Sequence, residues 1–479
     1  MLLFTFAAAV LTGIIFGLAP AFRGTRLDLT PALKEGTRSS AAEGRAGGRW
    51  FSLGNGLVIA QVALAVVVLV GAGLLVRTLQ NLRNVDPGFD TSNLLTFGLD
   101  PTLIGFKTPQ VDAFYRDLQQ RIGAIPGVES VSYSNSTLLS GSLWETGFHL
   151  EGTPQDQDSN ADYLPIGAGF FSTMHMRLLS GRNFNAADFA EAEVAEERDR
   201  AQEAVERARE AGLPAPSGSA AIPESAANDP PVPVIVNKTF VQKYFPKVNP
   251  LGVHFGAHEA DPAKGDWAAP GWEIVGVVSD AKYQDLRSPI NSTMYVPSSG
   301  GNTSFEVRTR TNPAAVTASI RSVVSQMDSN LPVFNVHTQA ELIDQLLFQE
   351  RMIAKLSGFF GILALVLACI GLYGLLSYEV SRRTREIGIR MALGAQPGGV
   401  LRLVVGQGTV LAINGTTAGV AVALGVTRYL KSMLYDIHAN DPATIAGVAI
   451  LLTLVAAAAC YIPARRAMRV DPMVALRYE

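Results

Sequence analysis

Five stretches of apolar residues constrain the fold of this chain more than any other feature of its sequence. A helix needs about 20 residues to cross the roughly 30 Å of hydrocarbon in a lipid bilayer. The five stretches are close to that length and cover residues 3–21, 54–76, 353–377, 403–426 and 442–463. Glycines recur in the second and third stretches, as they do where helices pack closely in lipid. The sequence therefore predicts five membrane-spanning helices.

The composition agrees with a chain that is shared between membrane and water. Hydrophobic residues make up 48% of the 479 residues and charged residues only 17%, with a mean hydropathy of +0.21. This balance is unusual for a soluble protein. Both cysteines, Cys369 and Cys460, lie in apolar stretches. We therefore interpret them as small hydrophobic residues and not as a disulfide.

The first stretch also allows a second interpretation, a cleaved signal peptide. A signal peptide carries basic residues before its apolar part. Here the basic residues begin at Arg23, after the apolar part. We therefore interpret residues 3–21 as a membrane span.

Basic residues between the stretches predict the orientation, because arginine and lysine gather on the cytoplasmic side of membrane proteins. They form three clusters: Arg23, Arg26, Lys34, Arg38, Arg45 and Arg49; Arg382, Arg383, Arg385, Arg390 and Arg402; and Arg465, Arg466, Arg469 and Arg477. One consistent alternation places all three clusters in the cytoplasm. Residues 78–350 then lie outside, and the C-terminus lies inside.

The two ends of the chain resemble each other. Pro20 and Arg23 correspond to Pro463 and Arg466, and each copy is an apolar span that ends in Pro-Ala and continues as a basic tail. The repeat predicts that residues 1–50 are the last span and basic tail of a preceding membrane module. The chain would then be a truncated form of a duplicated membrane protein.

Residues 78–350 form the predicted water-exposed domain. Each end of this segment has the pattern strand, helix, strand, at 94–99, 110–125 and 128–133 and again at 305–308, 313–327 and 332–336. Two such units far apart in sequence predict one split α+β subdomain built from both ends. Short strands at 234–236, 272–278 and 293–297 predict a β-rich subdomain inserted between them.

Residues 186–232 differ from the rest of this domain. The part up to Glu210 is mainly Ala, Glu and Arg, and the part after Ser217 is rich in Pro, Ala and Ser. This composition predicts a charged, solvated helix followed by a flexible linker. A role in binding a partner stays open.

Several motifs together carry a family resemblance. The block SYEVSRRTREIGIRMALGA at 377–395 resembles the cytoplasmic signature of FtsX-like ABC transporter permeases, and PARRA at 463–467 resembles the end of the same module. The outer segment resembles the MacB-type periplasmic core domain through five motifs: VDPGF at 85–89, LSGRNF at 179–184, VNKTF at 236–240, YFP at 244–246 and PLG at 250–252. The resemblance covers about residues 50–479, and the 186–232 segment is not part of it.

The resemblance implies an architecture and a set of partners. It implies an α-helical membrane protein with a large α+β extracytoplasmic domain, made of a split β-α-β "porter" part and an inserted β-rich "sabre" part. The domains would be a span at 51–78, a MacB-like periplasmic core domain at 79–350 and an FtsX-like permease domain with three spans at 351–479. Family resemblance further implies a homo- or heterodimer of permeases in the inner membrane and a separate cytoplasmic ABC ATPase.

Little in the sequence indicates an enzyme. It contains no Gly-x-x-x-x-Gly-Lys-Ser/Thr phosphate loop and no Gly-x-Ser-x-Gly elbow. His254 and His258 are the only close pair of histidines, and the glycines and proline near them favour a loop without a further ligand. We therefore expect no catalytic residue, cofactor, metal or nucleic-acid partner. We expect ATP to be hydrolysed by a separate polypeptide.

The cytoplasmic block contains the best candidate site. Its proposed ATPase-coupling residues are Arg385, Glu386, Ile387, Gly388, Arg390, Met391, Gly394 and Ala395. Glu386 and Arg390 have the i,i+4 spacing of an ion pair on one helix face. The basic residues would also serve as anchors at lipid headgroups. The family resemblance favours the alternative, a short coupling helix that docks on an ATPase.

We therefore expect a permease subunit of an ABC-type transporter. It would couple ATP hydrolysis to movement of its periplasmic domain and so export an envelope or drug-like substrate. The alternative is a transport-inactive membrane receptor or scaffold that binds an envelope partner.

Overall fold

The computed structural model describes residues 53–139, 141, 143–150, 159–212, 231–257, 271–298, 303–393, 396–429, 433–437 and 441–467. The predicted span at 3–21, its basic tail and the basic tail after residue 467 lie outside the described residues.

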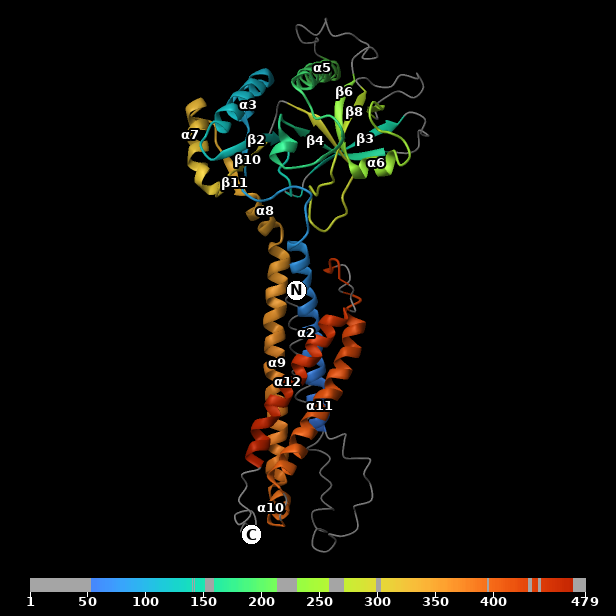
Figure 1. Cartoon of the computed structure of the whole chain (residues 1–479), viewed down its shortest axis with the longest axis vertical. Coiled ribbons are helices and arrows are strands. Elements are labelled where there is room, and N and C mark those ends of the chain that lie inside the picture. Colours follow the sequence, from blue (N-terminus) through green and yellow to red (C-terminus); the bar gives the residue numbers. More distant parts are fainter. Residues whose placement is uncertain are drawn as a thin grey trace. The chain divides into compact units, whose positions relative to one another are not determined.

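Among the described residues, four helices are long and apolar enough to cross a membrane (Figure 1): α2 (Leu53–Arg83), α9 (Phe348–Arg382), α11 (Pro397–Val426) and α12 (Pro442–Ala467). They confirm four of the five predicted spans. Both α2 and α9 extend beyond their apolar stretches at the end that joins the outer domain. Helix propagation is cooperative, so polar residues continue a helix once it has formed.

The chain divides into two compact units. The first comprises Met1–Ala63, Leu367–Ala418 and Thr453–Glu479, and the second comprises Leu64–Val366 and Gly419–Leu452. Each unit therefore contains parts of all four long helices. The outer domain belongs wholly to the second unit.

Two glycines in the first unit allow its helices to pack closely. A Cβ atom at Gly371 would lie 2.4 Å from Gln61 Oε1, and one at Gly408 would lie 2.3 Å from Cys460 Sγ. The Gln61 amide donates a hydrogen bond to the main-chain oxygen of Leu367, with Nε2 2.7 Å away. Small residues and interhelical amide bonds are the usual means of helix association in lipid.

One end of the outer sheet is built from β1 (Leu94–Leu99), β2 (Val128–Ser134), β10 (Thr303–Thr309) and β11 (Phe334–Thr338). Their order is β11-β1-β10-β2, with every pairing antiparallel. Helix α3 (Thr108–Gly123) connects β1 to β2 along the chain, and helix α7 (Thr317–Met327) connects β10 to β11. The predicted split β-α-β subdomain is thus confirmed, and Phe97, Tyr115 and Phe305 lie at the centre of its core.

The inserted part is a closed β-barrel. Its strands are β3 (Trp144–Leu150), β4 (Ser159–Ile166), β6 (Val232–Asn237), β7 (His254–Ala257), β8 (Trp272–Val278) and β9 (Thr293–Pro297). They follow the order β4-β3-β7-β8-β6-β9, and β9 also pairs with β4, which closes the ring. Phe148, Phe255 and Phe240 of α6 (Lys238–Tyr244) fill the core. The predicted β-rich subdomain is confirmed, and its closure leaves few free strand edges.

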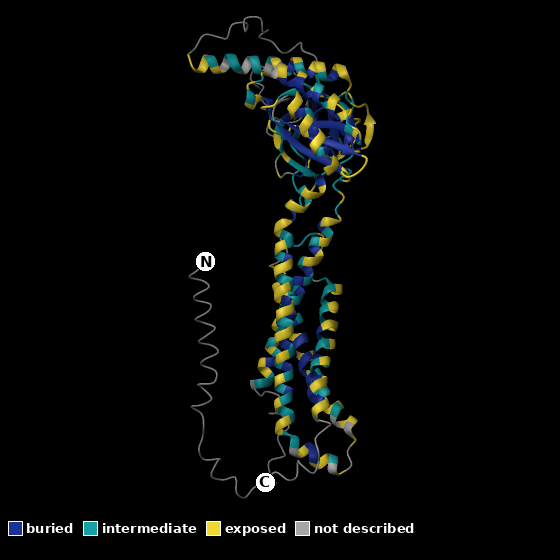
Figure 2. Cartoon of the chain, turned by 90° about the vertical axis from the view of Figure 1, so that its left-hand side faces the viewer, coloured by how far each residue is buried: buried dark blue, intermediate teal, exposed yellow. Residues whose placement is uncertain are grey.

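Five shorter elements complete the outer domain: η1 (Pro101–Ile104), α4 (Phe170–Thr173), β5 (Leu178–Gly181), η4 (Pro313–Val316) and α8 (Gln339–Leu346). A third hydrophobic cluster joins the two parts of the domain, with Leu94 from β1, Ile166 from β4 and Tyr295 from β9. Figure 2 shows these strands as largely buried, whereas the long helices carry many exposed residues. Exposed apolar side chains such as Phe359 and Ile362 are suited to lipid or to a partner helix.

The charged segment forms helix α5 (Ala186–Glu210), capped by Asn185. The helix was predicted, but the expectation that it is solvated is wrong for its first half. Asp188, Ala192 and Ala195 are buried, and the side chain of Asp188 accepts hydrogen bonds from the Arg182 guanidinium, with Oδ1 2.8 Å from Nη2. Alanine presents little apolar surface in a sequence profile, yet it permits close packing of a helix on a sheet. Most of the predicted linker, residues 213–230, lies outside the described residues.

Candidate functional site

The candidate site surrounds a short helix, α10 (Thr384–Ala392), in the first unit. Helix α9 ends at Arg382, and the Arg383 amide still bonds to the main-chain oxygens of Glu379 and Val380 at 3.1 Å. The Thr384 hydroxyl donates to the main-chain oxygen of Ser381 at 2.9 Å. These bonds satisfy the exposed carbonyls at the end of α9 and allow the chain to turn directly into α10.

One face of α10 is anchored in the unit. Ile387 is 8% exposed and Met391, four residues later, is half-buried. They form a hydrophobic cluster with Val404 of α11 and Ala464 of α12. Burial of a side chain such as Ile387 contributes about 1.5–3 kcal/mol. The cluster therefore holds α10 to the ends of three long helices.

The opposite face of α10 is free of contacts that would bury it. Glu386 and Arg390 are exposed. Ile389 is 41% exposed and Leu393, four residues later, is 82% exposed. Two exposed apolar side chains at i,i+4 spacing, flanked by charges of both signs, form a small surface suited to a groove on another protein.

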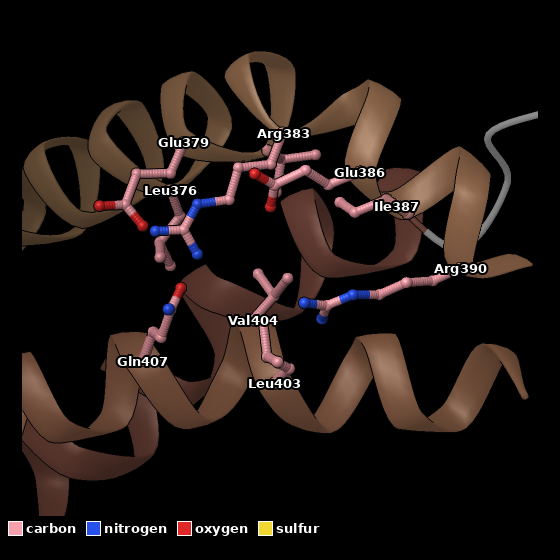
Figure 3. A pocket seen from close by; sticks show the side chains of 10 residues that line it. Leu376, Glu379, Arg383, Glu386, Ile387, Arg390, Leu403, Val404 and Gln407 are labelled. Atoms are coloured by element: carbon pink, nitrogen blue, oxygen red, sulfur yellow. The ribbon is translucent and has the colours of Figure 1, made fainter. Parts of the chain in front are cut away.

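A hollow of about 310 Å³ lies between α9, α10 and α11 (Figure 3). Its lining contains two carboxylates, two guanidinium groups, an amide and apolar side chains: Leu376, Glu379, Val380, Arg383, Glu386, Ile387, Arg390, Leu403, Val404 and Gln407. In Figure 3 the Arg383 side chain extends across the hollow, and Arg390 extends toward Leu403. A second hollow of about 390 Å³ shares Glu379, Arg383 and Gln407 with the first. The two hollows together present polar groups beside α10.

The predicted site residues divide into three groups. Glu386 and Arg390 lie on the exposed face, whereas Ile387, Gly388 and Met391 lie on the packed side. Arg385 lies in α10, but its side chain is outside the described set, and Gly394 and Ala395 are outside the described residues altogether.

The predicted ion pair between Glu386 and Arg390 does not form among the described side chains. No salt bridge joins them in that part of the structure. Helical spacing makes such a pair possible, but the local packing sets the side-chain directions.

Sequence reasoning missed the contributions of α9 and α11 to the site. Glu379 and Arg383 belong to the signature block and line both hollows. Gln407 lies within an apolar stretch, and its polarity there is the one signal that points to it. A polar residue in a membrane span is costly unless it faces a cavity or the bundle interior.

No group of three or more potential metal ligands occurs in the part of the chain that the structure describes. His254 lies in β7, and His258 lies outside the described residues.

A family model described as FtsX-like permease C-terminal matches residues 358–472. This range includes most of α9 and all of α10, α11 and α12. The carboxyl-terminal part of the chain is thus similar to FtsX-like permeases. The candidate site lies in this matched part, between α9 and α11. Four spanning-length helices and this family together make the chain a multi-pass membrane protein.

Sequence comparison finds similarity between this chain and named export proteins. It is 23% identical over 267 residues to the macrolide export ATP-binding/permease protein MacB of Marinobacter nauticus, covering 51% of this chain and 38% of that protein. It is 31% identical over 147 residues to MacB of Syntrophobacter fumaroxidans, covering 30% of this chain and 20% of that protein. It is 29% identical over 161 residues to the pyoverdine export protein PvdT of Pseudomonas syringae pv. syringae, covering 34% and 24%. The matches thus span less than two fifths of each relative.

Among solved structures, the periplasmic region of MacB from Actinobacillus actinomycetemcomitans aligns with 56% of this chain and 97% of that chain. The sequence identity is 14% and the TM-score is 0.31.

Proposed function

We propose that this permease transmits the work of an ABC ATPase to its outer domain during export. The observation that supports the proposal best is the division of α10 into two faces. Ile387 and Met391 anchor the helix to three long helices, while Ile389 and Leu393 stay exposed beside Glu386 and Arg390. A helix that is firmly held and presents an apolar pair can pass a push on its outer face into the helices behind it.

In this proposal the two groups of predicted residues have different roles. The exposed residues contact the ATPase, and the packed residues position α10 and pass on its displacement. Hydrolysis takes place on the ATPase, and this chain supplies no catalytic residue. In the proposed orientation, which the arginine clusters favour, α10 and the C-terminus lie in the cytoplasm and the outer domain lies outside. Pairing with a second permease chain completes the unit.

The proposal is tested by co-purification of a candidate ATPase with the full chain in detergent. Glu386→Lys and Leu393→Asp each place an unfavourable charge on the exposed face. Like-charge contacts across an interface cost up to several kcal/mol, so we expect recovery of the ATPase to fall at least tenfold. Both side chains are exposed, and surface substitutions usually change stability by no more than about 0.5 kcal/mol, so the amount of folded permease should stay the same.

A matched control separates docking from lipid anchoring. Ser381→Lys introduces the same lysine side chain at an exposed position at the end of α9, outside α10. Docking predicts that this variant binds the ATPase as the wild type does. Headgroup anchoring predicts that neither lysine affects ATPase recovery, and that result would refute the proposed role of α10.

A further inference from the structure

The second unit contains a short connecting segment that contacts both the membrane helices and the outer domain. Residues 433–437 belong to the connection between α11 and α12. We call these five residues the outer strap. Connections of this kind usually lie free on the surface, but this one is held from two sides.

The first side is the membrane bundle. Leu434 and Ile437 pack against a hydrophobic cluster that contains Val70 and Leu74 of α2 and Leu452 of α12. The Asn81 amide of α2 donates a hydrogen bond to the main-chain oxygen of Asp436, with Nδ2 3.2 Å away. The strap therefore covers the outer ends of these helices within the second unit.

The start of α12, just after the strap, is attached to α2 as well. The Arg77 guanidinium of α2 forms an ion pair with the Asp441 carboxylate. The same carboxylate accepts hydrogen bonds from the main-chain nitrogen and the hydroxyl of Thr444, at 2.9 and 2.6 Å. These bonds satisfy the orphan donors at the first turn of α12. Movement of α12 therefore pulls on α2 and on the strap together.

The second side is the outer domain. Arg287 lies in the loop between β8 and β9, and its Nη1 atom is 3.1 Å from the main-chain oxygen of Met433. Its Nε atom is 3.2 Å from Glu350 Oε1 in the first turn of α9. Tyr435 packs against the cluster that joins the two parts of the outer domain. One guanidinium group thus connects a loop of the barrel, the start of α9 and the strap.

Arg287 is itself held in position. The Asp285 carboxylate accepts hydrogen bonds from the main-chain nitrogens of Arg287 and Ser288, both at 2.6 Å. It also accepts one from the Ser288 hydroxyl at 2.7 Å, and the Lys282 ammonium donates to the main-chain oxygen of Ser288 at 2.5 Å. A loop closed by its own hydrogen bonds loses little entropy when it binds the strap.

The turn at the centre of the strap directs its side chains to both partners. Asp436 has a φ of 49°, in the left-handed region. Aspartate tolerates this conformation better than most residues. The residue before it, Tyr435, reaches the outer domain, while the residue after it, Ile437, reaches the membrane cluster.

We propose that the outer strap is a second route of transmission, which connects α11 and α12 to the barrel of the outer domain through Arg287 and Tyr435. The inference rests on the proposed function, in which α10 receives the push of the ATPase. Helices α2 and α9 reach the outer domain through the chain itself. The strap connects α11 and α12 to the same domain, so that all four helices move the domain together.

Hydrogen exchange of the full chain in nanodiscs tests the physical connection. Coupling between two sites is reciprocal. Ile437→Ala, on the membrane side, should therefore speed exchange of the barrel loop 279–292 at least fivefold. Arg287→Gln, on the outer side, should speed exchange of residues 441–446 by a similar factor. Tyr429→Ala is the matched control, because this aromatic residue lies in the same connection but is 87% exposed. If each substitution changes the exchange rate only on its own side of the strap, the proposed connection is refuted.

A second arm tests transmission. The complex with an ATPase that co-purifies with the wild type is trapped with a non-hydrolysable ATP analogue, and exchange is measured at α10 and at the loop 279–292. We expect Arg287→Gln and Tyr435→Ala to keep the nucleotide response at α10 and to lose at least half of it at the loop. A full response at the loop in both variants would overturn the strap while the proposed function survives. No response at α10 in the wild type would overturn the proposed function itself.

Discussion

Glu306 should make the stability of the outer domain depend on pH in an unusual direction. This residue lies on β10, at the centre of the split subdomain, and is 1% exposed. One carboxyl oxygen accepts a hydrogen bond from the Ser134 hydroxyl at 2.6 Å, and the other has no hydrogen-bond partner in the described structure. Burial raises the pKa of Glu306 from 4.5 to about 8, and the Ser134 bond opposes the rise only in part.

The sign and the magnitude follow from proton linkage. Between pH 4.5 and about 8 the folded protein keeps a proton that the unfolded chain releases, so stability falls as pH rises. The contribution is fully present below pH 4.5 and is lost as pH passes the folded pKa. One pKa unit corresponds to about 1.4 kcal/mol. Raising the pH from 5.5 to 9 should therefore cost roughly 3 kcal/mol, which corresponds to about 6–12 °C in Tm for a domain of this size.

Glu306→Gln removes the titration, and the measurement is the Tm of the full chain in detergent at pH 5.5 and pH 9. Fluorescence of Trp272, which packs against the barrel core, reports unfolding. We expect the variant to resemble the wild type at pH 5.5 and to exceed its Tm by several degrees at pH 9. Glu145→Gln, an exposed glutamate on β3, is the control and should keep the wild-type pH dependence. Equal pH dependence in the wild type and Glu306→Gln would refute the reasoning.

Four further predictions concern packing and topology. Gly408→Leu should abolish stable accumulation in the membrane, since even a Cβ atom there would overlap Cys460; Western blots of membrane fractions measure this. Arg308→Lys should destabilise the outer domain by about 2–4 kcal/mol, because the lysine cannot replace all the bonds that the guanidinium donates to three main-chain oxygens and to Asp90; thermal unfolding measures the loss. Ala195→Glu should destabilise it by about 1–3 kcal/mol by burying a charge under α5, whereas a fully solvated α5 would tolerate it. Ala395→Cys, in a chain without the two native cysteines, should resist an impermeant thiol reagent in intact cells, and rapid labelling would reject the proposed orientation.

The sequence by itself determined the elements that have a strong local signal. The apolar stretches of α2, α9, α11 and α12 have one way to satisfy their backbone groups in lipid, which is to form helices. Strands β1 and β8 were predicted from short apolar runs, β2 from its alternating residues and helix α3 from the helical spacing of its apolar residues. The split β-α-β arrangement followed because the same pattern occurs at both ends of one segment. The position of α10 followed from the signature block.

Only the tertiary structure decided the features that depend on distant partners. Strands β3, β4 and β7 have weak patterns, and they are strands because the barrel around them closes. Burial of Glu306 requires β1 and β2 from the first half of the domain, which flank β10, since an isolated strand would leave its carboxylate in water. The two faces of α10 are distinguished by Val404 and Ala464, which lie 12 or more residues away. The outer strap is likewise invisible in sequence: Arg287 and Met433 are 146 residues apart, and only the folded chain brings them together.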